Sequence, residues 1–332
     1  MIGVRIGLVG GGFAALRGAL ATAFDEAGWD GVDIVDVPVE VPAGGLDGVD
    51  VLCPMGSTIS AALLDATTPR LVQQFGVGLS GVDTRAAAAR GIPVDNVSGA
   101  ESGNAVAVAE IALLHLLALL RRYEEARANV ARRLVGEPMG TTLAGRTVGV
   151  LGVGDIGAEV ITRLRAFAAE PVGIGRRPRA DTPRAAALLD DDHYHRTADL
   201  LGALARCDDL VVCCPLTDET RGVVGAAALD ALGPGGHVVN VARGPVVDHD
   251  ALLGALRAGR VAGAGLDVTW TEPIDPDDAL LARNVVVTPH VGGITTSSYA
   301  GIAAGFVASV QRHLGRDAER GGAGPPVREL SS

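Results

Sequence analysis

Residues 147–157 read Thr-Val-Gly-Val-Leu-Gly-Val-Gly-Asp-Ile-Gly, an apolar run followed directly by a glycine-rich turn. The run suits a buried parallel strand, and the glycines after it fit the GxGxxG pattern at the start of a helix. Glycine allows a tight turn there and lets a pyrophosphate approach the helix N-terminus closely. The segment therefore predicts a dinucleotide-binding turn, whose members are Gly152, Gly154, Asp155, Ile156 and Gly157.

Short Val- and Ile-rich runs alternate with helical stretches on both sides of this turn. One series lies before it, at 4–9, 32–37, 49–53, 71–75 and 92–95. The second series begins at 147–151 and continues at 171–175, 210–214, 237–241, 262–267 and 285–288. Such alternation is typical of parallel βα units. With 332 residues, 48% of them hydrophobic, the chain can bury two cores, so we expect an α/β protein with two doubly wound parallel-sheet domains.

Two long helical segments accompany the strand series. Residues 102–134 form one, and the almost wholly apolar stretch 105–120 within it indicates a buried linker helix. Residues 295–314 form the other, and we expect this helix to pack back on the first domain. The tail 321–332 is rich in Gly and Pro and is expected to be loose.

A competing glycine pattern lies near the start of the chain, where Gly10-Gly11-Gly12-Phe13-Ala14-Ala15 also follows a predicted strand. It fits the looser GxGxxA form. Only the turn at 152–157 is followed in its own domain by arginine, carboxylate and histidine at strand ends. We therefore assign the dinucleotide to the second turn.

The segment 175–179 reads Gly-Arg-Arg-Pro-Arg and bears on the choice of dinucleotide. In an NAD enzyme the strand at this distance ends in Asp or Glu, which bonds the ribose hydroxyls. A carboxylate would repel a 2′-phosphate, whereas guanidinium groups bind it. We predict that Arg176, Arg177 and Arg179 bind this phosphate, so that NADPH is preferred and NADH remains possible. The alternative is a solvated arginine loop that binds no ligand.

Charge and composition argue against several classes of function. The net charge of −11 and a pI near 5.1 do not suit a broad nucleic-acid interface. All 28 basic residues are arginines, which removes lysine Schiff-base chemistry. No unbroken apolar run reaches about 18 residues, no secretory signal is recognised, and the four cysteines lack metal-ligand spacing. We expect a cytoplasmic protein that binds no nucleic acid, membrane or metal.

Polar segments at 240–244, 266–273 and 287–290 follow three predicted strands of the second domain. Ligands bind at the carboxyl ends of strands in open α/β sheets, so we expect Arg243, Glu272 and His290 to converge. Reduction of a 2-oxo acid needs a proton donor and a cation for the carboxylate. Histidine beside a carboxylate suits the donor, and an always-charged arginine suits the clamp. Taken singly, each has a structural alternative, such as a surface ion pair or a capping histidine.

Together with their flanks, these segments resemble the D-isomer-specific 2-hydroxyacid dehydrogenase family over about residues 50–315. The resemblance implies an NAD(P)-dependent oxidoreductase that acts on a CH–OH group. The family's catalytic Arg-Glu-His triad falls on Arg243, Glu272 and His290. Asp267 matches the family's carboxylate near the nicotinamide amide.

The resemblance also implies a division into domains. A flavodoxin-like substrate domain would comprise 1–100 and 293–332, and a Rossmann cofactor domain at 101–292 would be inserted into it. Family members are commonly homodimers joined through the cofactor domains. The apolar helix 105–120 offers a surface for such pairing.

Further residues receive roles from the resemblance. The loop 75–83 matches the family's substrate loop, where the amides of Val77 and Gly78 would bind the substrate carboxylate and successive amides form an anion cradle. Met55 would shape the pocket. Cofactor-side positions match at Pro215, Thr220, Val241, Ala242 and Asp267.

The chain departs from the family at Ser80, where many members are acidic, and over the irregular segment 96–104. The segment 175–179 resembles that of NADPH-dependent glyoxylate/hydroxypyruvate reductases. The loop 53–58 lacks the arginine with which phosphoglycerate-specific members grip a phosphate. These two features favour a small unphosphorylated 2-oxo acid and its 2-hydroxy acid, such as glyoxylate or hydroxypyruvate.

Several alternatives stay open. One is a dehydrogenase of a phosphorylated or phosphonate hydroxy acid, similar to 3-phosphoglycerate dehydrogenases. Another is a non-catalytic dinucleotide-sensing protein, similar to dehydrogenase-related corepressors, which the intact triad disfavours. Formate dehydrogenases carry glutamine at the position of Glu272. The cluster His193-Tyr194-His195 suggests a metal site only weakly, because adjacent residues do not converge on one ion.

Overall fold

The computed structural model describes residues 3–12, 14–40, 48–79 and 81–315. Those up to Asn104, together with those from Thr295 onward, form one compact unit, which we call unit 1. Ala105–Ile294 form the other, unit 2. Three features named above lie outside the described residues: Phe13, Ser80 and the tail 321–332.

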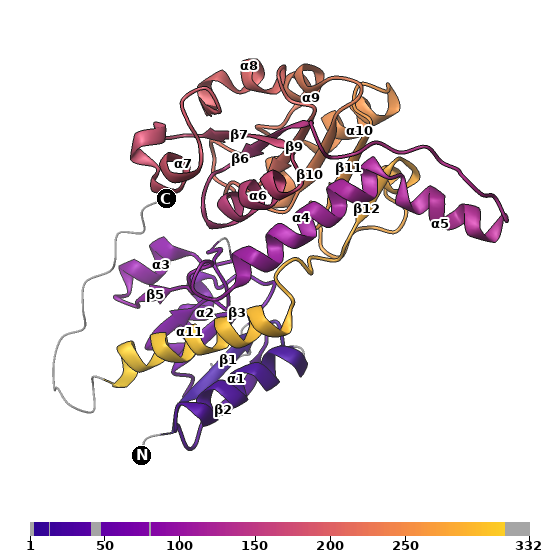
Figure 1. The fold of residues 1–332 in the computed structure, drawn as a ribbon. Helices are drawn as coiled ribbons and strands as arrows, with labels where there is room; N and C mark the ends of the chain where they lie inside the picture. Colours follow the sequence, from indigo (N-terminus) through magenta and orange to yellow (C-terminus); the bar gives the residue numbers. More distant parts are fainter. Residues whose placement is uncertain (1–2, 13, 41–47, 80, 316–332) are drawn as a thin grey trace. The chain divides into compact units, whose positions relative to one another are not determined.

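Unit 1 contains a five-stranded parallel sheet with the order β2-β1-β3-β4-β5 (Figure 1). Its strands are β1 (Arg5–Val9), β2 (Asp33–Val37), β3 (Val51–Pro54), β4 (Leu71–Gln73) and β5 (Val94–Asp95). Its helices are α1 (Ala14–Glu26), α2 (Ala61–Thr67), α3 (Thr84–Ala89) and α11 (Thr296–Leu314). This strand order is that of flavodoxin-like folds.

Both faces of the unit 1 sheet are buried. Along β3, Val51 and Cys53 belong to one apolar cluster and Leu52 to another, because successive side chains of a strand point to opposite faces. The helix α11, drawn in yellow in Figure 1, packs beside α1 although the two are far apart in sequence. The rings of Phe24 and Phe306 meet there edge to face, with centroids 6.5 Å apart.

Unit 2 contains a seven-stranded parallel sheet with the order β12-β11-β10-β9-β6-β7-β8. Its strands are β6 (Thr147–Leu151), β7 (Glu170–Gly175), β8 (Tyr194–Arg196), β9 (Asp209–Val212), β10 (His237–Asn240), β11 (Gly263–Leu266) and β12 (Val285–Val287). Its α-helices are α4 (Asn104–Leu120), α5 (Tyr123–Ala131), α6 (Asp155–Ala166), α7 (Pro183–Leu188), α8 (Leu200–Leu204), α9 (Ala226–Leu232) and α10 (His249–Arg257). The order from β8 to β11 is that of a Rossmann sheet, with β12 added at the edge. The two parallel sheets confirm the predicted fold class.

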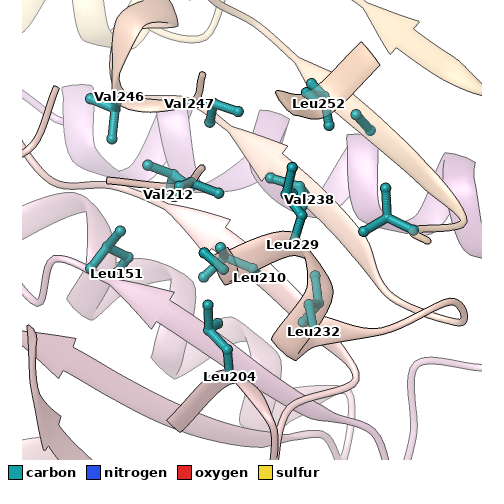
Figure 2. Packing of buried hydrophobic residues seen from close by; sticks show 14 of the residues in the cluster. Leu151, Leu204, Leu210, Val212, Leu229, Leu232, Val238, Val246, Val247 and Leu252 are labelled. Atoms are coloured by element: carbon teal, nitrogen blue, oxygen red, sulfur yellow. The ribbon is translucent and has the colours of Figure 1, made fainter. Parts of the chain in front are cut away.

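The core of unit 2 also lies on both faces of its sheet. Leu210 and Val212 of β9 pack in one cluster with Val238, and Figure 2 shows these side chains among leucines of the covering helices. Val211 and Val239 belong to the opposite cluster, with α4 and α6. A sheet whose strands are buried on both faces reads as continuous apolar runs, which is why the strands were visible in the sequence.

The expectation of one long helix at 102–134 is wrong. Two helices, α4 and α5, replace it and meet at a 60° bend. Arg122 lies between them with φ of +51°, a left-handed conformation that cannot continue a right-handed helix. Its amide bonds instead to the carbonyl of Leu119, which tightens the last turn of α4.

The strand β8 was not expected from the sequence, since its short segment was considered only as a weak metal site. Tyr194 is buried and pairs with Gly173 of β7, which makes β8 the edge of the sheet. Three residues with two polar side chains carry too little apolar pattern to be recognised as a strand.

No single helix among the described residues is long and apolar enough to cross a membrane. The bent pair of α4 and α5 passes that test of length and composition only when the two are taken together.

Candidate active site

The glycine turn between β6 and α6 is closed on the protein side and open at the helix N-terminus. Gly152 has φ of +99°, and a Cβ there would lie 2.6 Å from the backbone nitrogen of Cys214. A Cβ at Gly157 would lie 2.0 Å from the carbonyl oxygen of Gly152. At Gly154 a Cβ would meet nothing within 4 Å, and no side chain caps the helix that follows. The turn therefore offers room and unbonded helix amides to a pyrophosphate.

Asp155 and Ile156 are the first two residues of α6. Ile156 packs against the core of unit 2, and Asp155 pairs with Arg184 of α7. These contacts fix the start of the helix whose amides face the turn.

The three arginines after β7 differ in their availability. Arg179 is held by Asp191, with 2.7 Å from Nε to Oδ1, and also donates to a carbonyl of the α7 region. Arg176 pairs with Glu219 at 3.3 Å, and both side chains are more than half exposed. Arg177 is exposed and forms no ion pair with any described residue. Of the three, Arg177 is the most available to an anion.

Strand β8 supports this arginine loop. The hydroxyl of Tyr194 donates to the carbonyl of Arg177 over 2.7 Å, and a Cβ at Gly175 would lie 2.2 Å from that hydroxyl oxygen. The neighbouring histidines each pair with an aspartate of their own segment: His193 Nδ1 lies 2.6 Å from Asp190, and His195 Nδ1 lies 3.7 Å from its aspartate.

The competing glycine segment in unit 1 is occupied by the chain's own carboxylate. The amide of Gly12 donates to Asp36 Oδ1 over 3.1 Å, and Asp36 also pairs with Arg17. A Cβ at Gly10 would lie 2.4 Å from Ser57 Oγ. Because a carboxylate already accepts the loop amide, a phosphate there would be repelled.

Glu272 and His290 form a direct pair at the carboxyl edge of the unit 2 sheet. His290 Nδ1 lies 2.7 Å from Glu272 Oε2, and the amide of Thr269 donates to Oε1 over 3.2 Å. Partial burial would raise the pKa of Glu272, but the bond to His290 and nearby positive charge hold it below its usual value. The Nε2 atom of His290 has no hydrogen-bond partner among the described residues. That nitrogen is therefore available for proton transfer.

Arg243 is half-buried and forms no ion pair with any residue that the structure describes. Burial lowers the pKa of its guanidinium, and the charge of Glu272 opposes that shift. The side-chain amide of Asn240 donates to the carbonyl of Arg243 over 2.9 Å and accepts from the amide of Ala242. A half-buried arginine without a carboxylate partner suits an anionic ligand, because buried charges are otherwise paired.

The loops that carry Arg243 and Glu272 touch directly. A Cβ at Gly244 would lie 2.2 Å from the carbonyl oxygen of Thr269, so only glycine fits at that crossing. The structure thus brings two of the three expected residues into contact. It places the third, Arg243, close enough for its charge to act on Glu272 but outside ion-pair distance.

Asp267 holds the segment that carries His290. Its Oδ1 accepts from Thr288 Oγ1 at 2.6 Å and from the amide of Val291 at 2.9 Å, and its Oδ2 accepts from the amide of Gly292 at 2.9 Å. His290 has φ of +54°, a conformation that is costly for a residue with a side chain. These bonds over-determine the segment and hold His290 there. Since a carboxylate offers about four acceptor positions, Oδ2 keeps room for one more donor.

A cavity of about 400 Å³ in unit 2 is lined by the Glu272–His290 pair and by apolar side chains, including Ile274, Val287 and Pro289. The pair therefore faces a space large enough for small-molecule groups.

The two expected substrate-loop amides, those of Val77 and Gly78, have no hydrogen-bond partner among the described residues of unit 1. The carbonyl of Val77 is taken by Asn96 Nδ2 at 2.7 Å, and that of Gly76 by an amide of the neighbouring segment. The loop is therefore anchored through its carbonyls while its amides stay open. Met55 follows β3, packs against the unit 1 core and donates its amide to the end of β1.

The remaining cofactor-side positions belong to turns after β9 and β10. Thr220 Oγ1 donates to the carbonyl of Pro215 over 2.7 Å and accepts from the amide of Thr217 over 2.7 Å, which closes that turn. Val241 and Ala242 are buried, and the amide of Val241 bonds to β9. Thr220 thus shapes the turn through its own side chain.

Sequence reasoning missed several supporting residues. Asn240, Thr288 and His115 hold the site from behind, and Tyr194 holds the arginine loop. A buried polar residue at a strand end was the available signal for Asn240. No signal in the sequence connects His115 with Thr288, which lie 173 residues apart.

Comparison with known proteins agrees with this geometry. Residues 113–292 match the family model described as D-isomer specific 2-hydroxyacid dehydrogenase, NAD binding domain. Over 98% of the chain and 97% of the compared chain, the fold matches an NADPH-dependent glyoxylate/hydroxypyruvate reductase from Sinorhizobium meliloti solved with NADP and malonate. The TM-score is 0.79 and the identity 32%.

Curated relatives point to more than one substrate. A D-3-phosphoglycerate dehydrogenase of Mycobacterium leprae is 38% identical over 82% of this chain, which spans 50% of that relative's length. A hydroxyphenylpyruvate reductase of Plectranthus scutellarioides is 34% identical over 76% of this chain and 78% of the relative. By the family match and these identities, the chain belongs to the D-2-hydroxyacid dehydrogenase family of NAD(P)-dependent oxidoreductases that act on CH–OH groups.

Proposed function

We propose that this protein reduces a small unphosphorylated 2-oxo acid, such as glyoxylate or hydroxypyruvate, to its D-2-hydroxy acid with NADPH. The observation that carries the proposal is the contact of His290 Nδ1 with Glu272 at 2.7 Å, which leaves Nε2 open. A histidine bonded in this way is oriented by the carboxylate and presents one nitrogen to a substrate oxygen.

His290 then donates the proton from Nε2 to the oxygen that becomes the new alkoxide. Glu272 compensates the charge of the imidazolium before the transfer and holds the ring in place. Arg243 binds the substrate carboxylate and polarises the carbonyl, which explains why this half-buried cation has no partner of its own. The bound dinucleotide supplies the hydride.

The dinucleotide is held at the glycine turn and at the arginine loop. Its pyrophosphate meets the amides that follow Gly154, and Oδ2 of Asp267 accepts from the nicotinamide amide. Arg177 is the principal ligand of the 2′-phosphate, because Arg179 is already bonded to Asp191 and to a backbone carbonyl. Arg176 assists once it leaves Glu219.

Unit 1 contributes the substrate side. The open amides of Val77 and Gly78 bind the substrate carboxylate, and Met55 contacts its small remainder. The loop 53–58 carries no arginine, so a phosphorylated acid finds no cation there.

The test follows NADPH and NADH oxidation with glyoxylate, hydroxypyruvate, pyruvate, phenylpyruvate and 3-phosphohydroxypyruvate. We expect faster turnover with NADPH and with an unphosphorylated acid. Preference for the phosphorylated acid would replace the proposal by the phosphoglycerate-type function, to which the Mycobacterium leprae relative is similar. Binding of NADPH without turnover of any of these acids would favour the dinucleotide-sensing alternative.

Two matched variants test the cofactor assignment. Arg177→Ala removes charge-assisted bonds to the phosphate and should weaken NADPH binding about ten- to hundredfold while NADH binding is unchanged. Arg179→Ala, which removes an arginine used by the fold, should weaken both dinucleotides alike. Equal loss of NADPH and NADH in Arg177→Ala would contradict the assignment of the phosphate to Arg177.

We infer in addition that two copies of the chain form a homodimer. Most apolar side chains of α4 are buried inside unit 2, so α4 alone is a poor surface. Exposed apolar side chains gather instead in α5 and the segment after it, with Val130, Val135 and Met139 more than three-quarters exposed. Light scattering of the purified protein distinguishes a dimer from a monomer, and Val135→Asp together with Met139→Asp should shift the dimer toward monomer.

A further inference from the structure

His115 is a fully buried histidine of α4 that none of the proposed roles uses. Its Nε2 lies 3.0 Å from Thr288 Oγ1, and its Nδ1 is buried without a hydrogen-bond partner. The helix around it is built from alanine, leucine, valine and isoleucine, so an apolar side chain would fit the core pattern. Leaving a buried ring nitrogen unpaired costs free energy, which calls for a compensating role.

The protonation pattern of this contact follows from its partners. Asp267 Oδ1 can only accept from Thr288 Oγ1, at 2.6 Å, because it is a carboxylate oxygen. The single proton of the Thr288 hydroxyl is thereby used, so His115 Nε2 carries a proton and donates it. Burial holds the pKa of His115 below its usual value, with the charge of Asp267 opposing, which agrees with a neutral ring whose bare Nδ1 is the unpaired atom.

The place of the ring is set by glycine in β11. A Cβ at Gly265 would lie 2.7 Å from His115 Cβ and 3.1 Å from Nδ1. The ring therefore lies close against the backbone of β11, and a larger residue at 265 would displace it.

We propose that His115 is a positioning residue for the reaction, acting through the hydrogen-bond chain His115–Thr288–Asp267 on the segment that carries His290. The inference rests on the proposed function. Thr288 begins this segment, Asp267 accepts the amides of Val291 and Gly292 beyond it, and the amide of His290 bonds to the backbone carbonyl of Asp267.

The chain keeps His290 in its left-handed conformation. By donating to Thr288, His115 fixes the direction of the Thr288 hydroxyl and strengthens the bond that this hydroxyl makes to Asp267. Asp267 is then held in the orientation that binds both loop amides. Loss of the first donor loosens the segment and lets His290 relax toward ordinary backbone angles, away from the substrate.

The principal test compares His115→Leu with His115→Gln. Leucine removes the donor, whereas the Nε2 of glutamine stands the same number of bonds from Cα as that of histidine and restores it. We expect His115→Leu to lower kcat about three- to tenfold with the KM for dinucleotide unchanged, and His115→Gln to recover most of the loss. The thermal midpoint of His115→Leu should stay equal or rise, because the variant removes an unpaired buried nitrogen.

Hydrogen exchange of the Val291 and Gly292 amides provides a readout that does not depend on turnover. Exchange should be faster in His115→Leu than in the wild type and near the wild-type rate in His115→Gln. Equal exchange in wild type and His115→Leu would overturn the positioning role whatever the activity. A wild-type protein that turns over no 2-oxo acid, but shows this exchange pattern, would overturn the proposed function and leave the hydrogen-bond chain supported.

Thr288→Val covers the case in which His115→Leu does not fold. It removes the middle hydroxyl at nearly constant volume and should give the same loss of kcat and the same faster exchange, while Thr288→Ser keeps both near wild type. A Thr288→Val protein with wild-type exchange and kcat would overturn the proposal as well.

Discussion

The unit 2 sheet carries an arginine, a carboxylate and a histidine at each of its two ends. At the amino ends of the strands, Asp209 binds Arg146 through two bonds of 2.6 and 2.9 Å and His237 Nδ1 at 2.8 Å. At the carboxyl ends the same residue types are Arg243, Glu272 and His290. The Asp209 side chain is 0% exposed, whereas those of Glu272 and His290 are 41% and 45% exposed.

The difference lies in how completely the groups bond to one another. Asp209 accepts from Arg146, from the ring of His237 and from the amide of His237, so the cluster is closed within the protein. At the other end Arg243 has no ion pair among the described residues and His290 keeps one nitrogen open. Saturated polar groups stabilise a fold, and open ones are available for chemistry. Residue type alone does not separate the two.

His290→Gln is the change that should break the carboxyl-end cluster most severely. Removing the proton donor should lower kcat for 2-oxo acid reduction about 10²- to 10⁴-fold, with NADPH affinity unchanged. Steady-state kinetics and a fluorescence titration of NADPH measure the two quantities. The matched control is His237→Gln, which should keep kcat within about twofold of wild type once folded. Equal losses of kcat in both variants would contradict the contrast between the two ends.

Asp209→Asn should break the amino-end cluster. Removing one partner of a buried ion pair leaves Arg146 uncompensated, and the free energy of unfolding should fall by about 3–5 kcal/mol. The control is Glu272→Gln, whose half-exposed pair should change stability by about 1 kcal/mol or less. Urea unfolding of both variants measures the difference. A Glu272→Gln protein as destabilised as Asp209→Asn would show that the exposed pair is structural too.

The stabilisation from Asp209 should depend on pH in one direction. Burial would raise the pKa of this carboxyl, but the bonds from His237 and Arg146 hold it below its usual value. A lowered pKa in the folded state contributes stability above the pKa of the unfolded chain, and this is lost as pH falls through the folded value. The gap in unfolding free energy between wild type and Asp209→Asn should therefore be constant near neutral pH and shrink below about pH 4. A gap that grows on acidification would contradict this.

The sequence was sufficient for the sheets and for the contact of Glu272 with His290, for physical reasons. Strands buried on both faces read as apolar runs, and parallel strands bring residues at their carboxyl ends to one edge. Arg122 shows a limit: a left-handed residue leaves no mark in an apolar helical pattern. The short edge strand at Tyr194 shows another, because three residues carry almost no periodicity.

The hydrogen bonds that support the candidate site could not be read from the sequence either. His115 and Thr288 meet only because α4 lies against β11 where Gly265 leaves space. Likewise, the arginine-rich segment predicted a phosphate site, yet Arg179 is bonded to the protein itself, and only the fold shows which arginine stays available. Long-range polar contacts depend on packing that no local pattern encodes.

The exposed pair Arg176–Glu219 should give the smallest effect and extends the comparison to a third kind of ion pair. With side chains 54% and 69% exposed, it should contribute little to stability, so Glu219→Gln should leave the unfolding midpoint unchanged. Glu219 nevertheless competes with a 2′-phosphate for Arg176, so the variant should bind NADPH about two- to fivefold more tightly and NADH equally well. Isothermal titration with both dinucleotides, at low and at high salt, measures this, and the gain should shrink at high salt because exposed charges are screened. A gain for NADH of the same size would mean that Glu219 acts on the shared part of the dinucleotide and not through Arg176.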